Sequence, residues 1–226
     1  MSGGGEPLLE ARGVGRRAPG DGAWLLRDVD LAIARGERVA VAGPSGAGKT
    51  LLLRALALLD PVDAGEILWE GEAVPDDRVP AFRRSAVYLH QRPALFEGSV
   101  RDNLRAVFDL DANGERAYDE DVAVASLERL GRGAAFLDKP AADLSGGEEQ
   151  IVAFLRAIQL DPAVMLLDEP TAALDREATG SIERLVAEWA DERPDERGFV
   201  WVSHDPSQAD RVAERTVRLR SGSLAP

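Results

Sequence analysis

The chain has 226 residues, of which 45% are hydrophobic and 30% are charged, and its formal net charge is −13. This length and balance indicate one globular domain with room for a subdomain. The acidic surface argues against a broad nucleic-acid contact, and the absence of cysteine excludes disulfides, thiolate metal sites and cysteine nucleophiles.

The first half of the chain alternates short strands with a helix. Strands are predicted over residues 25–34, where apolar and polar residues alternate, and over the apolar runs 38–42 and 66–69. The Leu/Ala-rich stretch 49–59 predicts a helix that Asp60-Pro61 ends. Its apolar run is too short to cross a bilayer, which takes about 20 residues, so we expect no direct membrane insertion.

The second half contains a helical insertion within further strand and helix alternation. Periodic apolar residues over 99–143 indicate helices, and an amphipathic helix is predicted over 148–160. A brief strand at 87–89 and buried strands at 164–167 and 199–202 surround these segments, with a helix at 179–190. Such alternation predicts an α/β core with a parallel sheet.

Residues 43–50 match the phosphate-loop pattern G-x-x-x-x-G-K-[ST]. The glycines let backbone N–H groups point at a phosphate, and the following helix directs its positive end at the anion. Lys49 is expected to reach the β- and γ-phosphate oxygens, and the Thr50 hydroxyl to bind Mg²⁺. A Gly-rich turn without a ligand is the alternative, which the flanking strand and helix disfavour. The expected nucleotide contacts are Gly43, Pro44, Ser45, Gly46, Ala47, Gly48, Lys49 and Thr50.

Adjacent carboxylates end the apolar run 164–167. Asp168 is expected to orient the Mg²⁺ shell, and Glu169 to face the attacking water as a general base. An acidic pair alone would be read as a polar cap on the next turn. The phosphate loop in the same chain favours the catalytic interpretation.

A second anion-binding pattern opens the helix predicted over 148–160. In Leu144-Ser-Gly-Gly-Glu148, Ser145 can bond to an anion, while Gly146 and Gly147 leave backbone amides bare at a helix N-terminus. Taken alone, this segment would be an ordinary Ser-Gly-Gly loop.

These motifs together resemble the nucleotide-binding domain of the ABC transporter family, from about Leu8 to Leu224. They stand in the family's order, which is the phosphate loop, Gln91, the signature at residues 144–148, Asp168-Glu169, the D-loop at residues 173–175, and His204. The resemblance implies a P-loop NTPase core with a parallel sheet, an N-terminal antiparallel β subdomain and a helical subdomain. We expect a single domain over 1–226, with the core in about 6–91 and 144–226 and the helical subdomain in about 92–143.

The resemblance also implies roles for individual residues. Gln91 would bind Mg²⁺ and link the attacking water to a transmembrane partner, Asp175 would cross a dimer interface, and His204 would contact the γ-phosphate. By contrast, His90 beside Gln91 is expected to be structural.

Assembly follows from the same resemblance, because in this family the signature of one subunit completes the ATP site of the other. We therefore expect a homodimer around two ATP molecules with Mg²⁺, driving a separate transmembrane permease. The chain would be cytoplasmic, held at the inner face of the cell membrane by that permease. Residues 93–100 are expected to form part of the surface that meets it.

Two positions depart from the family pattern. Ile151 stands where relatives usually carry arginine, and no aromatic residue stands where relatives stack the adenine. Arg17 is a candidate to stack on the base, and Trp24 is another, although an edge tryptophan is the plainer interpretation of Trp24.

Within the family, the segment 91–104 and the compact length look most like small bacterial iron-export ATPases and a related plant subunit. Phosphate and amino-acid uptake ATPases share much of this pattern. Two interpretations from other classes remain: a soluble ABC protein without a transport role, and a binding-only regulator, against which Glu169 argues.

Overall fold

The computed structural model describes residues 7–20, 22–110, 117–172 and 174–225. Its N-terminal part is an antiparallel sheet in the order β2-β1-β4-β5. The strands predicted at 25–34 and 66–69 are confirmed as β2 and β4, and Glu70-Gly71 forms the turn into β5 with positive φ at both residues. β1 carries several register shifts that break its alternation, so the sequence pattern did not reveal it. The strands are β1 (Pro7–Arg17), β2 (Trp24–Ala34), β4 (Ala64–Trp69) and β5 (Glu72–Ala73).

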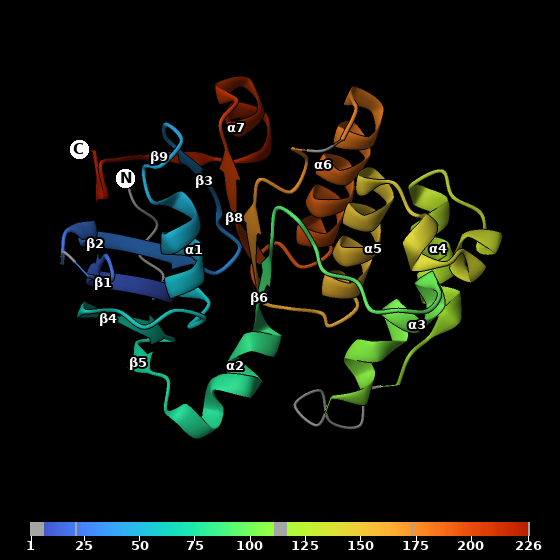
Figure 1. Ribbon diagram of the computed structural model, residues 1–226, viewed down its shortest axis with the longest axis horizontal. Coiled ribbons are helices and arrows are strands. Elements are labelled where there is room, and N and C mark those ends of the chain that lie inside the picture. Colours follow the sequence, from blue (N-terminus) through green and yellow to red (C-terminus); the bar gives the residue numbers. More distant parts are fainter. Residues whose placement is uncertain (1–6, 21, 111–116, 173, 226) are drawn as a thin grey trace.

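The central sheet has the order β10-β9-β3-β8-β7-β6, and its strands run parallel except for β10. The strands predicted at 38–42, 87–89, 164–167 and 199–202 are confirmed as β3, β6, β7 and β8. The members are β3 (Arg38–Ala42), β6 (Ala86–Leu89), β7 (Val164–Asp168), β8 (Gly198–Ser203), β9 (Arg215–Arg220) and β10 (Ser223–Leu224). The predicted α/β fold with a parallel sheet, an antiparallel β part and a helical part is confirmed (Figure 1).

The helices predicted at 49–59, 148–160 and 179–190 are present with shifted ends, whereas two further helices, at 79–85 and 206–212, were not predicted. The helix at 49–59 ends earlier than predicted, because Leu58 adopts a left-handed conformation with φ 53° and Arg54 turns to bond Asp60 at 2.7 and 2.8 Å. The described part of segment 99–143 contains two α-helices joined by loops and 3₁₀ turns, the latter at Ala106–Asp109, Ala134–Asp138 and Ala141–Asp143. Another 3₁₀ turn lies at Asp76–Arg78. The helices are α1 (Lys49–Leu56), α2 (Val79–Ser85), α3 (Val100–Arg105), α4 (Glu120–Arg129), α5 (Gly146–Ile158), α6 (Arg176–Asp191) and α7 (Pro206–Val212).

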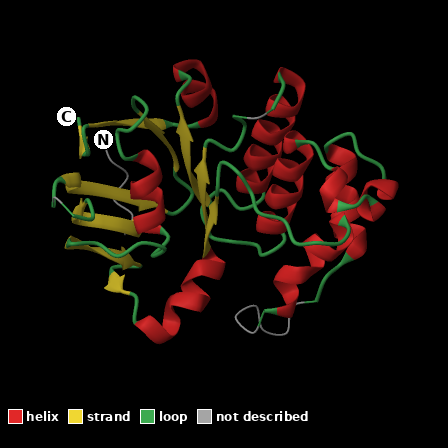
Figure 2. Cartoon of the chain, viewed as in Figure 1, coloured by secondary structure: helices red, strands yellow, loops and turns green. Residues whose placement is uncertain are grey.

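The two faces of the parallel sheet pack into different hydrophobic cores. Side chains alternate between the two faces along a strand. Leu166 of β7 therefore packs in the core formed with α1 and the antiparallel sheet, whereas Leu167 packs in the core formed with α3, α4, α5 and α6. In the same way Val200 and Trp201 of β8 divide between the two cores. Figure 2 shows the consequence, with the antiparallel strands on one side of the sheet and most helices on the other.

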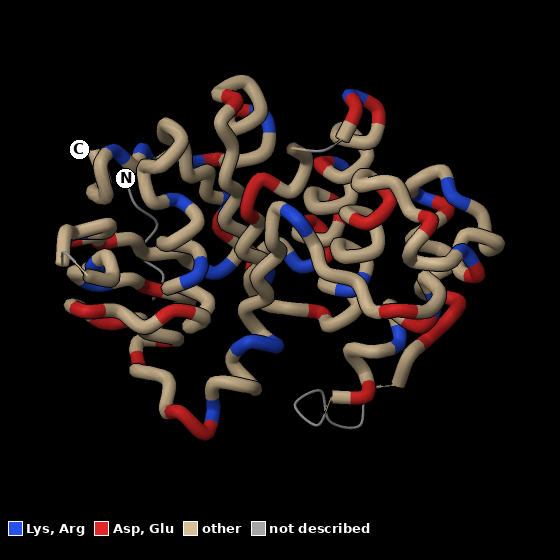
Figure 3. Tube along the Cα trace, viewed as in Figure 1, with Lys and Arg blue, Asp and Glu red and all other residues tan. Residues whose placement is uncertain are grey.

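Charged residues are spread over both sides of the molecule. Figure 3 shows acidic segments on the antiparallel sheet, on the loops at the end of the parallel strands and on the helical part. Within the described ranges, no helix is both long and apolar enough to cross a membrane.

Candidate functional site

The phosphate loop joins β3 to α1 and ends in a bare helix N-terminus. Gly48 precedes the helix with φ 102°, and a Cβ there would come within 2.8 Å of the Leu26 side chain, so only glycine fits. A glycine offers no side chain to cap the first-turn amides, which leaves them for an anion. Ser45 and Thr50 are exposed and within reach of a ligand from solvent.

Lys49 lies inside this loop, with 7% of its surface exposed. Its Nζ donates to the carbonyl oxygens of Gly43 at 2.9 Å and Pro44 at 3.1 Å. These partners are neutral, so they hold the ammonium group without cancelling its charge. The loop therefore presents a positive centre to a phosphate.

Asp168 and Glu169 lie at the carboxyl end of β7, where they were expected. Asp168 is 3% exposed and accepts a 3.0 Å hydrogen bond from the Tyr88 hydroxyl of the neighbouring strand β6. Burial, and then the charge of Asp168, raises the pKa of Tyr88, so the phenol stays protonated and remains a donor. Tyr88 was missed by sequence reasoning, although a hydroxyl in an otherwise apolar strand is a recognisable signal.

Gln91, Glu169 and His204 converge from three parallel strands. The Gln91 amide Nε2 donates to Glu169 Oε2 at 3.0 Å, and His204 Nδ1 lies 3.7 Å from the same oxygen. Glu169 itself has φ 47°, a left-handed conformation that residues other than glycine adopt rarely. The structure thus brings together the residues that were expected to surround the attacking water. His90, expected to be structural, accepts the Arg92 N–H with Nδ1 at 2.9 Å.

A hollow of about 200 Å³ beside this cluster is supported by a buried polar network. Gln208 of α7 donates to Thr171 Oγ1 at 2.9 Å and to Glu183 Oε1 at 2.8 Å, while its carbonyl accepts from Ser203 at 2.8 Å. Gln208 was also missed, because a glutamine at one helix position carries no pattern. Its bonds tie the segment before His204 to the segment after Glu169.

The signature segment forms the N-terminus of α5. Ser145 is the N-cap residue, and it forms a reciprocal capping box with Glu148. Glu148 also accepts from Lys139 at 2.8 Å and from Arg132 at 3.2 Å. The Lys139 contact, with the Ser145 backbone bond, lowers the pKa of Glu148 to about 2, so this carboxylate is ionised and charge-paired.

Signature and phosphate loop lie on opposite sides of the parallel sheet, since α5 and α1 pack on its two faces (Figure 1). Asp175 of the expected D-loop is the N-cap of α6 and accepts the Ala178 N–H at 2.8 Å. Ala173, the first residue of that loop, lies outside the described residues. The structure therefore brings the other motif residues at the ends of the parallel strands together beside the phosphate loop, but the signature of the same chain lies away from them.

Arg17 and Trp24, the two candidates for the adenine platform, stack on each other. The Arg17 guanidinium carbon lies 3.9 Å from the centre of the Trp24 ring, and its Nη1 donates to the Gly22 carbonyl at 2.9 Å. Trp24 is the first residue of β2. The carbonyl oxygen of the next residue, Leu25, lies 3.2 Å from the position that a Cβ on Gly48 would take. β2 therefore passes the phosphate loop one residue after Trp24.

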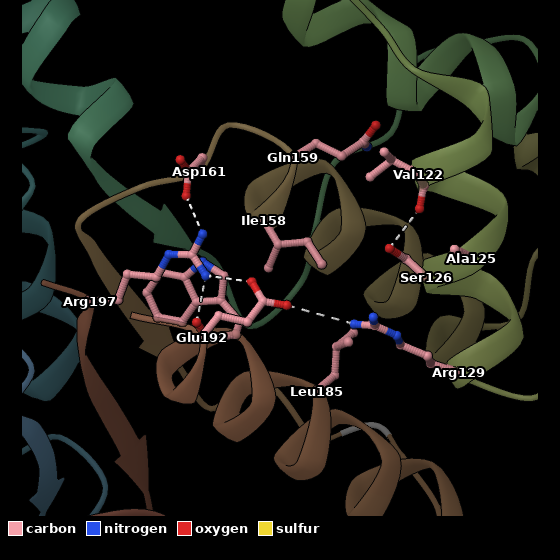
Figure 4. Close-up of a pocket in the computed structure, with 11 residues that line it drawn as sticks. Val122, Ala125, Ser126, Arg129, Ile158, Gln159, Asp161, Leu185, Glu192 and Arg197 are labelled. Atoms are coloured by element: carbon pink, nitrogen blue, oxygen red, sulfur yellow. Dashed lines mark hydrogen bonds and ion pairs between the residues drawn. The ribbon is translucent and has the colours of Figure 1, made fainter. Parts of the chain in front are cut away.

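A larger hollow of about 380 Å³ opens between α4, α5 and α6, on the face of the sheet away from α1 (Figure 4). Arg197 is buried at its floor and bonds Asp161 Oδ1 at 2.5 Å, Glu192 Oε2 at 2.8 Å and the Trp189 carbonyl at 2.6 Å. Figure 4 also shows Glu192 reaching Arg129, at 3.9 Å. This network joins the end of α6 to β8 and takes no part in the nucleotide site.

Comparison with known proteins assigns the family. The model of the family described as ABC transporter matches residues 26–172. The chain belongs to the ABC transporter family. It is an ABC-type ATPase subunit, as the motif order had predicted.

Relatives of this ABC ATPase differ in their named roles. Over 96% of the chain it is 39% identical to Protein STAR1 of Oryza sativa subsp. japonica, and it spans 62% of that protein's length. It is 39% identical over 88% of the chain to the phosphate import ATP-binding protein PstB 3 of Natronomonas pharaonis, spanning 74% of it. It is 34% identical over 95% of the chain to the probable iron export ATP-binding protein FetA of Escherichia coli K12, spanning 92% of it.

A solved ABC cassette has the same fold. The ATP-binding cassette MJ0796, in a dimeric post-hydrolysis state bound to ADP and Pi, superposes with a TM-score of 0.83 and 27% identity. The match covers 96% of this ABC ATPase and 97% of that chain. Import and export relatives both occur, so the family assignment stands without a direction or cargo.

Proposed function

We propose that two copies of this ATPase close around two ATP molecules and drive a separate membrane permease, which holds them at the inner face of the cell membrane. The observation that carries this proposal is the separation of the two anion-binding loops on opposite sides of one sheet. One chain cannot close both loops on the same nucleotide. Support comes from MJ0796, which is dimeric in its ADP- and Pi-bound structure.

In this proposal Glu169 takes the proton of the attacking water. Gln91, which already bonds the carboxylate of Glu169, positions that water, and His204 contacts the γ-phosphate from the adjoining strand end. The charge that develops on the phosphate faces Lys49 and the first-turn amides of α1. Across the dimer, Ser145, Gly146 and Gly147 would bind the phosphate from the other side, with Asp175 beside the interface.

Mg²⁺ fits the donors that the chain provides. Thr50, Gln91 and Asp168 offer a hydroxyl, an amide and a carboxylate oxygen, the ligand class that this ion prefers. Among the described residues no group of three or more histidine, cysteine or acidic side chains forms a metal cage. The phosphates of the nucleotide would supply further oxygen ligands to an ion bound by Thr50, Gln91 and Asp168. When bound, Mg²⁺ supplies charge neutralisation at the phosphates.

The permease is expected to dock at a groove lined by residues 95–99, 138, 140–142 and 149. Phe96 is 61% exposed on one wall, while the buried Asn103 fixes its backbone by accepting the Phe96 N–H at 2.8 Å and donating to its carbonyl at 3.0 Å. Arg156 of the signature helix donates to the neighbouring Ala94 carbonyl at 3.1 Å. A partner seated on Phe96 would therefore act on the helix that carries the signature.

Phe96→Asp is expected to lower permease capture at least about tenfold, because a charge replaces an exposed aromatic anchor at an interface. The tagged chain is purified from detergent-solubilised membranes of its own cells, and multi-span proteins that accompany it are quantified by mass spectrometry. ATP affinity is measured on the same preparations and is expected to stay unchanged.

Val122→Asp is the matched control for that substitution. Val122 is 51% exposed in the first turn of α4, where an acidic residue suits the helix dipole, and it lies away from the groove. This variant is expected to capture the permease as the wild type does. If Phe96→Asp and the wild type capture the permease equally, the groove is not the docking site of the permease.

For the cargo, we propose metal export, with iron as the first candidate. This rests on the resemblance to FetA, of which the chain spans 92%. Uptake of an anion such as phosphate is the second candidate, because PstB 3 is the more identical of the two relatives. The class of membrane protein that co-purifies with the chain decides between them.

The Arg17–Trp24 stack is proposed as the platform for the base. Arg17→Ala and Trp24→Ala are each expected to weaken ATP and GTP binding by about threefold to thirtyfold, the range of a stacking or cation–π contact. Because stacking contacts the face of the base and not its hydrogen-bonding edge, the ATP to GTP preference is expected to be small. Affinities are measured by calorimetry.

Inorganic tripolyphosphate serves as the control ligand for these two variants, because it binds the phosphate loop without a base. Its affinity should be the same in wild type and in both variants. Unchanged ATP affinity in both variants would show that the Arg17–Trp24 stack is a structural contact of β2 and does not bind the base.

A further inference from the structure

The hydroxyl of Tyr88 makes a contact that the family motifs do not describe. Tyr88 lies on β6 opposite Leu166 of β7, so its ring stands two residues before the end of that neighbouring strand. From there its O–H reaches Asp168 Oδ2 at 3.0 Å. Asp168 is almost fully buried, so this bond lies in a region of low dielectric where it is strong.

A cation from the phosphate-loop helix also interacts with the hydroxyl. Arg54 lies four residues after Thr50 on α1, is held by the two bonds to Asp60, and interacts electrostatically with Tyr88. A phenol has one proton to donate and lone pairs to accept. Because a guanidinium cannot accept a hydrogen bond, the phenolic proton goes to Asp168.

We propose that Tyr88 is a positioning residue for the magnesium shell: its hydroxyl fixes one carboxylate oxygen of Asp168 and thereby keeps the other available to the metal. This inference rests on the proposed function, in which Asp168 serves the metal. A carboxylate tethered through one oxygen cannot rotate freely about its bond to Cβ. The chain of Arg54, Tyr88 and Asp168 thus links the phosphate-loop helix to the metal's carboxylate.

Other roles for the ring do not need the hydroxyl. Tyr88 packs edge-on against His90, with ring centres 6.0 Å apart, and phenylalanine would keep this contact. Tyr88→Phe therefore removes the bond to Asp168 while leaving the packing of β6 in place. The substitution separates a positioning role from a structural one.

The test is the affinity of Mn²⁺ for the protein saturated with a non-hydrolysable ATP analogue, measured from the free Mn²⁺ signal in electron paramagnetic resonance. Residues that orient a metal ligand typically change metal affinity by 10- to 100-fold when removed. Tyr88→Phe is expected to weaken Mn²⁺ binding about tenfold. The affinity for the analogue in the absence of metal should be unchanged. The melting temperature of the apoprotein should stay within a few degrees of the wild-type value.

Tyr118→Phe is the matched control. It removes the other phenolic hydroxyl of the chain, which is buried and has no hydrogen-bond partner within the described ranges. It should leave Mn²⁺ affinity as in the wild type. Equal Mn²⁺ affinity in Tyr88→Phe and wild type overturns the inference. A wild-type protein that binds neither Mn²⁺ nor the analogue overturns the proposed function instead.

Discussion

Glu169→Gln is expected to lower kcat for ATP hydrolysis at least about a hundredfold while ATP affinity stays within about twofold. A positioned general base contributes about 10²- to 10⁴-fold to a rate, and an amide cannot take the proton of the attacking water. ATP binding depends on Lys49 and on the backbone amides of the phosphate loop, which the substitution leaves in place. Phosphate release and calorimetric binding, on one preparation, measure the two quantities.

The local geometry allows this substitution without loss of fold. Gln91 donates its amide to Glu169 Oε2, and a glutamine at 169 can still accept that bond with its own carbonyl oxygen. The side chain is also partly open to solvent, at 22%. Because the variant binds ATP without consuming it, two copies should remain associated in the presence of ATP, which sedimentation measures.

Glu188→Gln, on an exposed face of α6, is the control for the same chemical change and should keep wild-type turnover. Two outcomes would contradict the assignment. Slow turnover in the wild type that does not fall further in Glu169→Gln would favour a regulator that only binds ATP. A Glu169→Gln variant that remains monomeric with bound ATP would contradict the proposed dimer.

Arg197→Met is expected to lower the free energy of unfolding by about 3 kcal/mol, the low end of the range for breaking a buried ion pair. The arginine side chain is 9% exposed and serves Asp161, Glu192 and the end of α6 together. Methionine keeps most of the volume but removes the bonds to Asp161 and Glu192 and leaves the buried Trp189 carbonyl without this donor. For a chain of this size the melting temperature should fall by about 6–12 °C.

Arg193→Met tests whether burial is the reason. Arg193 also pairs with Asp161, but its side chain is 41% exposed. Its loss should cost less than about 1 kcal/mol, as for surface ion pairs. Urea unfolding followed by circular dichroism measures both variants, and equal losses would contradict the argument. ATP turnover at low temperature should be unaffected in either, because the network lies away from the phosphate loop.

Local patterns carried the sequence prediction furthest. The phosphate loop is specified by its own eight residues, and the strands β3, β7 and β8 are apolar runs that any buried parallel strand requires. The convergence of Gln91, Glu169 and His204 followed from motif order, because parallel strands end at one edge. None of these predictions depends on contacts between residues that are distant in the sequence and belong to no recognisable motif.

Contacts between distant residues could not be predicted. The bond from Tyr88 to Asp168 spans 80 positions, and the bond from Arg197 to Asp161 joins two loops without a motif. Arg17 and Trp24 were candidates to stack on adenine separately, whereas the structure stacks them on each other. β1 was missed because its bulges remove the alternation by which a strand is recognised.

Lys49 and Lys139 are the lysines of the chain, since every other basic side chain except the two histidines is an arginine. The first is enclosed by the phosphate loop, and the second is paired with Glu148 at the signature. Reagents that acylate side-chain amines therefore have two targets in this chain, one inside the phosphate loop and one paired with the signature. Acylation of either lysine would remove a positive charge at one of these two loops.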